Sequence, residues 1–559
     1  MIPTNRWRPA GGLSLEPNAM SAAMELKRSL ALTAGPGAGK TEMLAQRADF
    51  LFRTGACRYP QRILAISFKS DASKNLKARV RVRCGPELAS RLDCHTFHAF
   101  AKRIIDKFRP ILTGTDALDA DYGIGDVRVT GRQITFDDMV PLAVQILKKS
   151  ALARNAVRQT FSDVFLDEFQ DCTLSQYQLI KVAFKDTNVT LTAVGDTKQK
   201  IMGWAGALEG IFQIFAKDFD AIPLNLYQNF RSKPRLRRMQ NEMVKVMDAQ
   251  AAVPDEELAE NDGLIEILQY SNSQEEAEEL ATMIASWIKE DGIDPSEIAV
   301  LVSKQLNLYC DHLLVELGKR KIPYRNEDAT QELSSEPIAG LIVDFLLIVA
   351  GTHQHAAHTR LVNLIVFNSD GESAEYEARA RWDSFVSRSR ARFFDGGESL
   401  SKAGALERLV QEMLAIVGRD AVVALAADYE HGSRLSDLID STVSRLKALL
   451  LEEHDPSKAF ARFSGDSAVK IMTIHKSKGL EFDTVIILGV EKETFWGKPI
   501  EERSAFFVGI SRAKNRLYLT VSNYREWPNS ARRWDENRTG HEEFLGYTGE
   551  YEIDDDWGQ

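Results

Sequence analysis

Short apolar runs alternate with longer segments of mixed polarity along most of the chain. Residues 42–52 carry apolar side chains at helical spacing, and residues 34–41 separate them from the first of these runs. In the first 230 residues the runs lie at 30–33, 63–68, 164–166, 189–194 and 224–227. Buried strands that alternate with amphipathic helices are typical of an α/β fold built on a parallel sheet.

The same alternation returns in the second half, where one long helical stretch interrupts it. Runs at 264–270 and 298–302 predict strands, and a capping box from Ser273 to Glu276 opens a helix between them. Strands return at 469–474 and 484–488. The pattern predicts a first α/β domain (1–100 and 156–222) with a small insertion (101–155) and a second α/β domain (223–335 and 466–540) with a helical insertion (336–465). An acidic tail (541–559) follows, and we expect it to be solvated.

Composition limits the kind of protein. A chain of 559 residues is too long for one core, and its five scattered cysteines favour a reducing compartment over a zinc or iron–sulfur site. No apolar segment opens the chain, and the most apolar window, 338–350, carries Asp344, so we expect a core helix. The sequence therefore predicts a cytoplasmic protein without a membrane partner.

Charge is unevenly distributed along the chain. The formal net charge is -10, which does not suggest a nucleic-acid-binding protein. Residues 58–109, however, hold thirteen Lys or Arg against four acids. Because a local basic face can bind phosphates whatever the total charge, this stretch is a candidate nucleic-acid surface, although a solvated face is the simpler alternative.

A glycine-rich turn joins the first predicted strand to the first predicted helix. Its sequence at 34–41 is Ala-Gly-Pro-Gly-Ala-Gly-Lys-Thr. Backbone N–H groups of such a loop surround the phosphates of a nucleotide, the lysine reaches the β- and γ-phosphates, and the final hydroxyl ligates Mg²⁺. The predicted binding residues for ATP are Gly35, Gly37, Ala38, Gly39, Lys40 and Thr41, with Thr41 also on Mg²⁺.

Carboxylates follow the predicted strand at 164–166. Asp167 would hold Mg²⁺ through water, and Glu168 would orient and deprotonate the attacking water, which is the pair that a phosphate-loop hydrolase requires. After the run at 189–194, Gln199 is placed to sense the γ-phosphate. These positions predict nucleoside triphosphate hydrolysis.

Aromatic and cationic residues follow other predicted strands. Phe68 and Lys69 end the second strand, a second cluster lies at 95–100, and Trp204 lies on a glycine-flanked turn. Aromatic faces stack on bases and cations bind phosphates in single-strand grooves. Burial in the core is the alternative for each aromatic side chain.

Taken together, these motifs resemble the UvrD/Rep/PcrA group of superfamily 1 helicases, in that group's order along nearly the whole chain. The resemblance implies two RecA-like motor domains with small, mainly helical insertions. It implies that Phe230 stacks on adenine, Arg231 and Arg512 reach the γ-phosphate from the second motor, and Glu481 binds the ribose. The implied DNA contacts are Phe68, Lys69, Thr96, Phe97, His98, Trp204, His475 and Lys476.

The chain departs from the group's pattern at two places. The glutamine that reads adenine has no clear counterpart, and Asn18 is the nearest candidate. Met202 and Ala205 stand where the group has Tyr and Arg in its third motif.

The resemblance implies an ATP-dependent translocase and helicase, 3′ to 5′, acting on single-stranded DNA and on junctions of single and double strands. The alternative is a DNA-gated ATPase subunit that signals to or remodels a partner such as a nuclease and unwinds little. The candidate protein partners are a nuclease and a second copy of the chain. Some compact members serve in this way in antiphage defence, the Gabija system among them. An RNA helicase is a third possibility.

Overall fold

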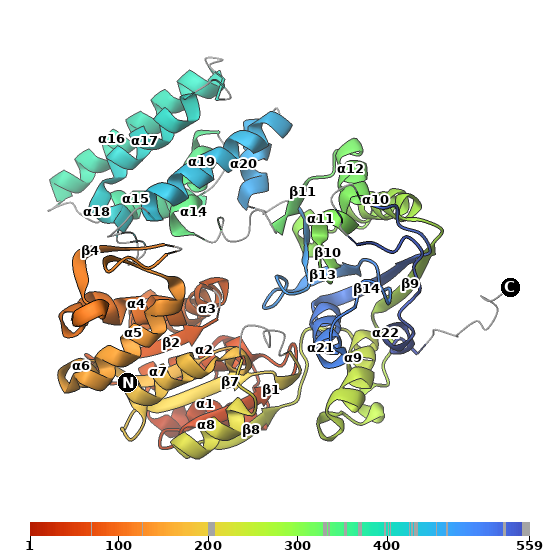
Figure 1. The fold of residues 1–559 in the computed structure, drawn as a ribbon. Helices are drawn as coiled ribbons and strands as arrows, with labels where there is room; N and C mark the ends of the chain where they lie inside the picture. The colour runs from red at the N-terminus through yellow and green to blue at the C-terminus, as the bar shows by residue number, and fades with distance from the viewer. Residues whose placement is uncertain are drawn as a thin grey trace.

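The computed structural model describes most of residues 1–549. It leaves out residues 69, 126, 200–206, 328–332, 334–335, 351–354, 367–371, 396–398, 401, 403, 424, 426–428, 430–433, 454, 465–467, 529–530 and 532, and everything after 549. Two parallel sheets flanked by helices lie side by side, with a helical domain above the first of them (Figure 1). The predicted fold class is confirmed.

The first sheet has six parallel strands in the order β3-β2-β6-β7-β1-β8. Its strands are β1 (Leu30–Ala34), β2 (Arg62–Ser67), β3 (Leu92–Thr96), β6 (Phe161–Leu166), β7 (Thr190–Gly195) and β8 (Ile222–Leu226). The predicted boundary at 222/223 was wrong, because β8 pairs with β1 and completes this sheet.

Neighbouring residues of these strands face opposite sides of the sheet, and each side is covered. Leu30 and Leu32 belong to one core, with α1 (Pro17–Met24), α2 (Lys40–Arg53) and α3 (Ser70–Ala89). Ala31 belongs to the other core, whose helices are α4 (Phe97–Phe108), α5 (Phe136–Lys149), α6 (Ala151–Thr160), α7 (Leu174–Phe184) and α8 (Ile211–Phe219). Burial on both faces explains why the strands read as continuous apolar runs.

The segment 101–155 shares its core with the first sheet. Ile105 of α4 and Ile146 of α5 are fully buried in the same cluster as Leu64 and Val164 of the strands. Two short strands, β4 (Leu118–Ile124) and β5 (Gly131–Ile134), form a separate small sheet beside them. The segment is therefore carried on the first sheet and has no core of its own.

The second sheet has the order β11-β12-β10-β13-β14-β9. Its strands are β9 (Leu264–Tyr270), β10 (Ile298–Val302), β11 (Tyr324–Asn326), β12 (Val469–Thr473), β13 (Phe482–Ile487) and β14 (Ala513–Ser522). The covering helices are α9 (Pro234–Met247), α21 (Pro499–Ile510) and α22 (Glu542–Gly546) in one core, and α10 (Ser273–Lys289), α11 (Leu306–Tyr309) and α12 (Asp311–Lys319) in the other.

Two local predictions in this part of the chain were wrong. The cap of α10 is Asn272, whose side chain accepts from the N–H groups of Gln274 and Glu275, one residue before the predicted capping box. The predicted acidic tail is not solvated throughout, because Phe544 and Leu545 of α22 are buried in the second sheet's core. Burying these two apolar side chains is favourable enough to hold the short helix on the core although its neighbours in sequence are charged.

The helical domain interrupts the second sheet between β11 and β12 and has its own core around Trp382. Its helices are α14 (Pro337–Val349), α15 (His355–Val366), α16 (Glu372–Arg390), α17 (Ala405–Val417), α18 (Arg419–Val423), α19 (Arg434–Glu452) and α20 (Pro456–Ser464). The apolar window at 338–350 forms α14 in this core. Within the described residues, no helix is long and apolar enough to span a bilayer.

Candidate active site

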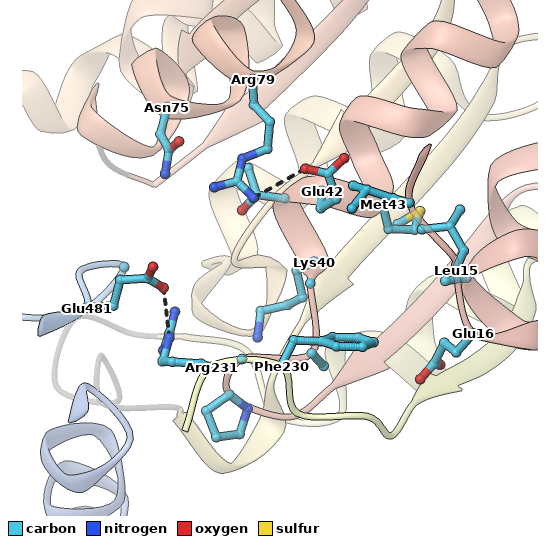
Figure 2. A pocket seen from close by; sticks show the side chains of 18 of the residues that line it. Leu15, Glu16, Lys40, Glu42, Met43, Asn75, Arg79, Phe230, Arg231 and Glu481 are labelled. Atoms are coloured by element: carbon cyan, nitrogen blue, oxygen red, sulfur yellow. Dashed lines mark hydrogen bonds and ion pairs between the residues drawn. The ribbon is translucent and has the colours of Figure 1, made fainter. Parts of the chain in front are cut away.

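A cavity of about 620 Å³ lies between the two sheets (Figure 2). Side chains of the first sheet's domain line one wall, and side chains from the second sheet's domain and the connection to it line the other. The predicted site residues on this cavity are Gly37, Ala38, Gly39, Lys40, Thr41, Glu168, Gln199, Phe230, Arg231, Glu481 and Arg512. The fold thus brings together residues that are up to 475 positions apart.

The glycine-rich turn leaves the carboxyl end of β1 and runs into α2. Gly37 and Gly39 have φ values of 68° and 73°, a region that disfavours side chains. At Gly37 a Cβ atom would also lie 2.6 Å from the Arg231 Cβ, so the turn requires glycine there. Lys40 Nζ donates to the carbonyl oxygens of Ala34 and Gly35 at 3.2 and 3.0 Å. Burial lowers the pKa of Lys40.

Asp167 and Glu168 follow β6 at the same edge of the sheet. Burial and the neighbouring Glu168 carboxylate raise the pKa of Asp167 to about 7, a cost that a bound cation would offset. Burial also acts on Glu168, but the ammonium groups of Lys478 and Lys40 outweigh it and hold the Glu168 pKa below its ordinary value. The Thr41 hydroxyl and the Asp167 carboxylate are oxygen donors of the kind that Mg²⁺ prefers.

Glu168 has a φ of 53°, which is uncommon for a residue with a side chain. Its carboxylate is held in place, because Gln170 Nε2 donates to Glu168 Oε2 at 2.6 Å. Strained backbone at a carboxylate that lines a cavity is a feature of functional sites. The geometry therefore fits a base that is fixed in position and ionised.

Arg512 enters the cavity from the end of α21 in the second domain. It is 2% exposed, and burial lowers its pKa to about 9. Its guanidinium donates to Gln199 Oε1 at 2.8 Å, and Gln199 Nε2 in turn donates to Asp196 Oδ2 at 2.9 Å. Gln199 thus links the arginine of one sheet to the carboxyl end of β7 in the other.

Arg231 lies on the connection between the two sheets. Its Nε is 2.9 Å from Glu481 Oε2, and its Nη1 donates to the main-chain carbonyl oxygen of Ser511 at 3.0 Å. Burial raises the pKa of Glu481, but the Arg231 charge outweighs burial and lowers it. Arg231 is therefore held by residues of the second domain, the domain that carries Arg512, and both arginines line the cavity with Lys40. Figure 2 shows Arg231 beside Glu481.

Lys478 is a site residue that the sequence analysis did not single out. Its ammonium pairs with the Asp171 carboxylate, donates to the Gln199 carbonyl at 2.9 Å, and lies 3.7 Å from Glu168 Oε2. The side chain is 7% exposed, and Asp171 is 2% exposed. The sequence feature that could have identified it is its position, two residues after the predicted DNA contact Lys476 and directly before Gly479. Gly479 has a φ of 87°. Lys478 forms a buried ion pair between the two α/β domains.

We expect Lys478→Met to lower the DNA-stimulated kcat by about tenfold or more. Breaking a buried pair leaves Asp171 without its cation, which typically costs about 3–5 kcal/mol, and here the cost falls on the contact between the domains. The measurement is steady-state ATPase with thermal unfolding as a check on the fold. Lys492→Met, which removes a half-exposed pair with Glu542, is the matched control. An unchanged kcat in Lys478→Met would contradict a coupling role.

The far end of the cavity is lined by apolar side chains and by Phe230. Phe230 is 64% exposed, and its backbone N–H donates to the Gly37 carbonyl at 3.0 Å. Asn18, the predicted adenine contact, is not among the described residues that line the cavity. Its amide donates to the Asn225 carbonyl at 2.7 Å and so ties α1 to β8. In this structure Asn18 binds β8, and its role as an adenine contact stays a prediction.

The predicted DNA contacts lie mostly at carboxyl ends of strands. Phe97 follows β3 but is buried in the core, where it is 3% exposed. Its ring meets that of Phe68 edge-on, with the ring centroids 6.0 Å apart. This prediction was wrong, because residue 97 falls on the apolar face of α4. Thr96 caps that helix by accepting from the Ala99 N–H at 3.2 Å. His98 is half-buried, with its ring edge on Phe136 at 5.7 Å.

The remaining predicted DNA contacts divide into two groups. Phe68 follows β2 and is half-buried, while His475 and Lys476 follow β12 of the second sheet. Lys476 Nζ donates to the Glu327 carbonyl at 3.3 Å. Lys69 and Trp204 lie outside the described residues, as do Met202 and Ala205.

Comparison with known proteins gives matches along most of the chain. The family model described as UvrD/REP helicase N-terminal domain matches residues 15–116 and 126–220, and the UvrD-like helicase C-terminal domain matches 224–375 and 446–524. The ATP-dependent DNA helicase PcrA of Bacillus subtilis is 25% identical over 611 residues, covering 89% of this chain and 81% of PcrA. The ATP-dependent DNA helicase Rep of Escherichia coli is 23% identical over 610 residues, covering 88% of each chain.

Proposed function

Because the chain belongs to the UvrD/Rep family of helicases, it is an ATP-driven DNA helicase, and we propose that it moves 3′ to 5′ along single-stranded DNA. The observation that supports a motor most directly is the divided cavity. One wall carries Lys40 and Glu168, whereas Arg231 and Arg512 approach from the other wall. Hydrolysis in such a site depends on how the two domains are placed relative to each other.

The residues of the cavity have distinct roles in the proposed reaction. The backbone of the turn and Lys40 bind the phosphates, and Glu168 orients the water and takes its proton. Arg231 and Arg512 stabilise the charge that develops on the transferred phosphoryl group. Thr41 and Asp167 would hold Mg²⁺, which neutralises phosphate charge when bound.

Two contacts would transmit the state of the nucleotide to DNA. Arg512 and Lys478 both bind Gln199, at its side chain and its carbonyl. Lys478 also lies in the same turn as His475 and Lys476, which we propose contact DNA together with Phe68, Lys69, Thr96, His98 and Trp204. A movement of Gln199 would therefore be passed through Lys478 to the proposed DNA contacts His475 and Lys476, which lie three and two residues before it.

In this proposal the two α/β domains are the motors. The first comprises residues 1–100 and 156–226, with 101–155 carried on it, and the second comprises 227–335 and 466–549. The helical domain at 336–465 is an insertion in the second motor. The strand β8 belongs to the first motor, so the connection that follows it, with Phe230 and Arg231, is the hinge.

We expect single-stranded DNA to raise the ATPase rate at least about tenfold over no nucleic acid, since binding draws on phosphates and stacked bases. RNA should raise it less, because the relatives that the chain matches are DNA helicases. Streptavidin on a 5′-biotin should be displaced faster than on a 3′-biotin. Faster displacement from the 3′ end would contradict the direction. The DNA-gated ATPase alternative predicts full ATPase activity with no displacement and no strand separation on a 3′-tailed duplex.

A further inference from the structure

We propose that a second cavity, behind the glycine-rich turn, binds a small organic anion with an apolar body. This cavity has a volume of about 410 Å³ and lies between the turn, the hinge after β8, helix α9 and the segment 251–258. Arg237 of α9 would hold the phosphate or carboxylate head of the ligand. Binding at this site does not depend on the proposed function, whereas its effect on hydrolysis rests on it.

The second cavity is distinct from the nucleotide cavity, although the turn forms a wall of both. Pro36, Ala38 and Phe230 line the two cavities. Lys40 and Arg512 line the nucleotide cavity and are not among the described residues that line the second. A ligand in the second cavity would therefore bind beside a nucleotide and not in its place.

Arg237 is a cation without a partner. Its guanidinium makes no hydrogen bond or ion pair with any residue that the structure describes, and its Nε is shielded from water. Arg238, next to it on α9, instead donates to the Leu258 carbonyl and to Asn261 Oδ1, both at 2.8 Å. Buried donors almost always have an acceptor, and an oxyanion is the acceptor that matches the fork of a guanidinium. An unpaired guanidinium at the wall of a cavity therefore indicates an anionic ligand.

Two buried amide side chains of the cavity hold its walls. Asn241 exchanges two hydrogen bonds of 2.8 Å with the backbone of Val253. Gln240 accepts from Asn229 Nδ2 and donates to the Ser232 hydroxyl, both at 3.2 Å. These bonds fix the outer segment and the hinge on α9, so the cavity is formed before a ligand enters it.

The rest of the lining suits a ligand that is both charged and apolar. Lys198 lies 3.7 Å from the buried Asp196 carboxylate, and Glu257, which also lines the cavity, is exposed, so water screens its charge. A cavity of this volume is in the range that holds small organic molecules. Its buried apolar side chains are Leu226, Val244, Leu258 and Phe507.

A ligand in this cavity would connect the two proposed motors. Lys198 belongs to the first motor, Arg237 and Phe507 belong to the second, and the hinge lies between them. A ligand that binds one placement of two domains better than another shifts the population toward that placement. We therefore expect the ligand to slow the domain movement on which hydrolysis depends.

The first experiment measures binding by isothermal titration to the full chain saturated with a non-hydrolysable ATP analogue, so that the nucleotide cavity is occupied. The probes are phenyl phosphate and benzoate, with inorganic phosphate and phenol as probes that lack the apolar body or the charge. We expect phenyl phosphate or benzoate to bind one site at least about tenfold more tightly than the last two probes. The tighter of the two identifies the head group. Equal affinity for all four probes, no binding, or displacement of the analogue would overturn the proposal.

Arg237→Met should weaken binding of the preferred probe by about tenfold or more, and Arg237→Lys, which keeps the charge without the fork, should restore part of it. Lys245→Met is the matched control, because Lys245 lies on the same helix and pairs with Glu242 outside the cavity. It should bind the probe as the wild type does. Thermal unfolding checks that each variant is folded, and an unchanged affinity in folded Arg237→Met would overturn the assignment of Arg237.

The second experiment measures ATP hydrolysis with saturating single-stranded DNA at rising concentrations of the preferred probe. We expect kcat to fall by at least about twofold at saturating probe, and to fall less in Arg237→Met. A rise in KM for ATP with unchanged kcat would place the probe in the nucleotide cavity and overturn the proposal. A wild-type protein without DNA-stimulated hydrolysis would overturn the proposed function instead, and the titration would still decide whether the second cavity binds the anion.

Discussion

Arg512→Ala is expected to lower kcat for ATP by roughly a thousandfold or more, with nucleotide affinity changed much less. An arginine that meets the γ-phosphoryl group from a second domain contributes about 10³ to 10⁵ in rate. The contacts of the glycine-rich turn come from the other domain and remain in the variant. Loss of the guanidinium also leaves Gln199 Oε1 without its donor. The measurement is single-turnover hydrolysis beside equilibrium binding of a non-hydrolysable analogue.

Arg503→Ala is the matched control for this variant. Arg503 lies on α21, the helix that ends just before Arg512, but it pairs with Glu543 outside the cavity. Thermal unfolding of both variants separates a catalytic loss from a loss of stability, since Arg512 is buried. Hydrolysis at the wild-type rate in a folded Arg512→Ala protein would contradict the two-domain site.

Glu168→Gln is expected to reduce hydrolysis by about 10² to 10⁴ while ATP still binds. The amide keeps the shape of the side chain and its contact with Gln170, but it cannot take a proton from water. Lys40→Ala should also abolish hydrolysis, and by a different route, because it removes a cation from the phosphates and so weakens binding. Isothermal titration with ATP distinguishes the two variants.

The control for Glu168→Gln is Glu209→Gln, at an exposed position of the same domain. It should hydrolyse ATP at the wild-type rate. If Glu168→Gln turned over normally, the general base would have to be another group. If Lys40→Ala bound ATP as tightly as the wild type, the glycine-rich turn would not be the phosphate site.

Local sequence pattern was enough to predict the strands and the nucleotide-binding turn. The apolar runs at 30–33 and 63–68 correspond to β1 and β2. They could be recognised because a strand buried on both faces is apolar at nearly every position. The turn was recognisable because its glycines, its lysine and its threonine all lie within one stretch at 34–41. The carboxylates after β6 followed from the same local order of strand and loop.

Tertiary structure alone decided what covers each side chain. Periodicity places Phe97 on an apolar face but does not say that the sheet covers it, and the β8 run reads the same whichever sheet it joins. The Glu16 carboxylate accepts hydrogen bonds from backbone N–H groups 211 and 212 positions away. Lys478 meets Asp171 across 307 positions. Contacts at such separations depend on how two folded domains pack, and no window of sequence contains both partners.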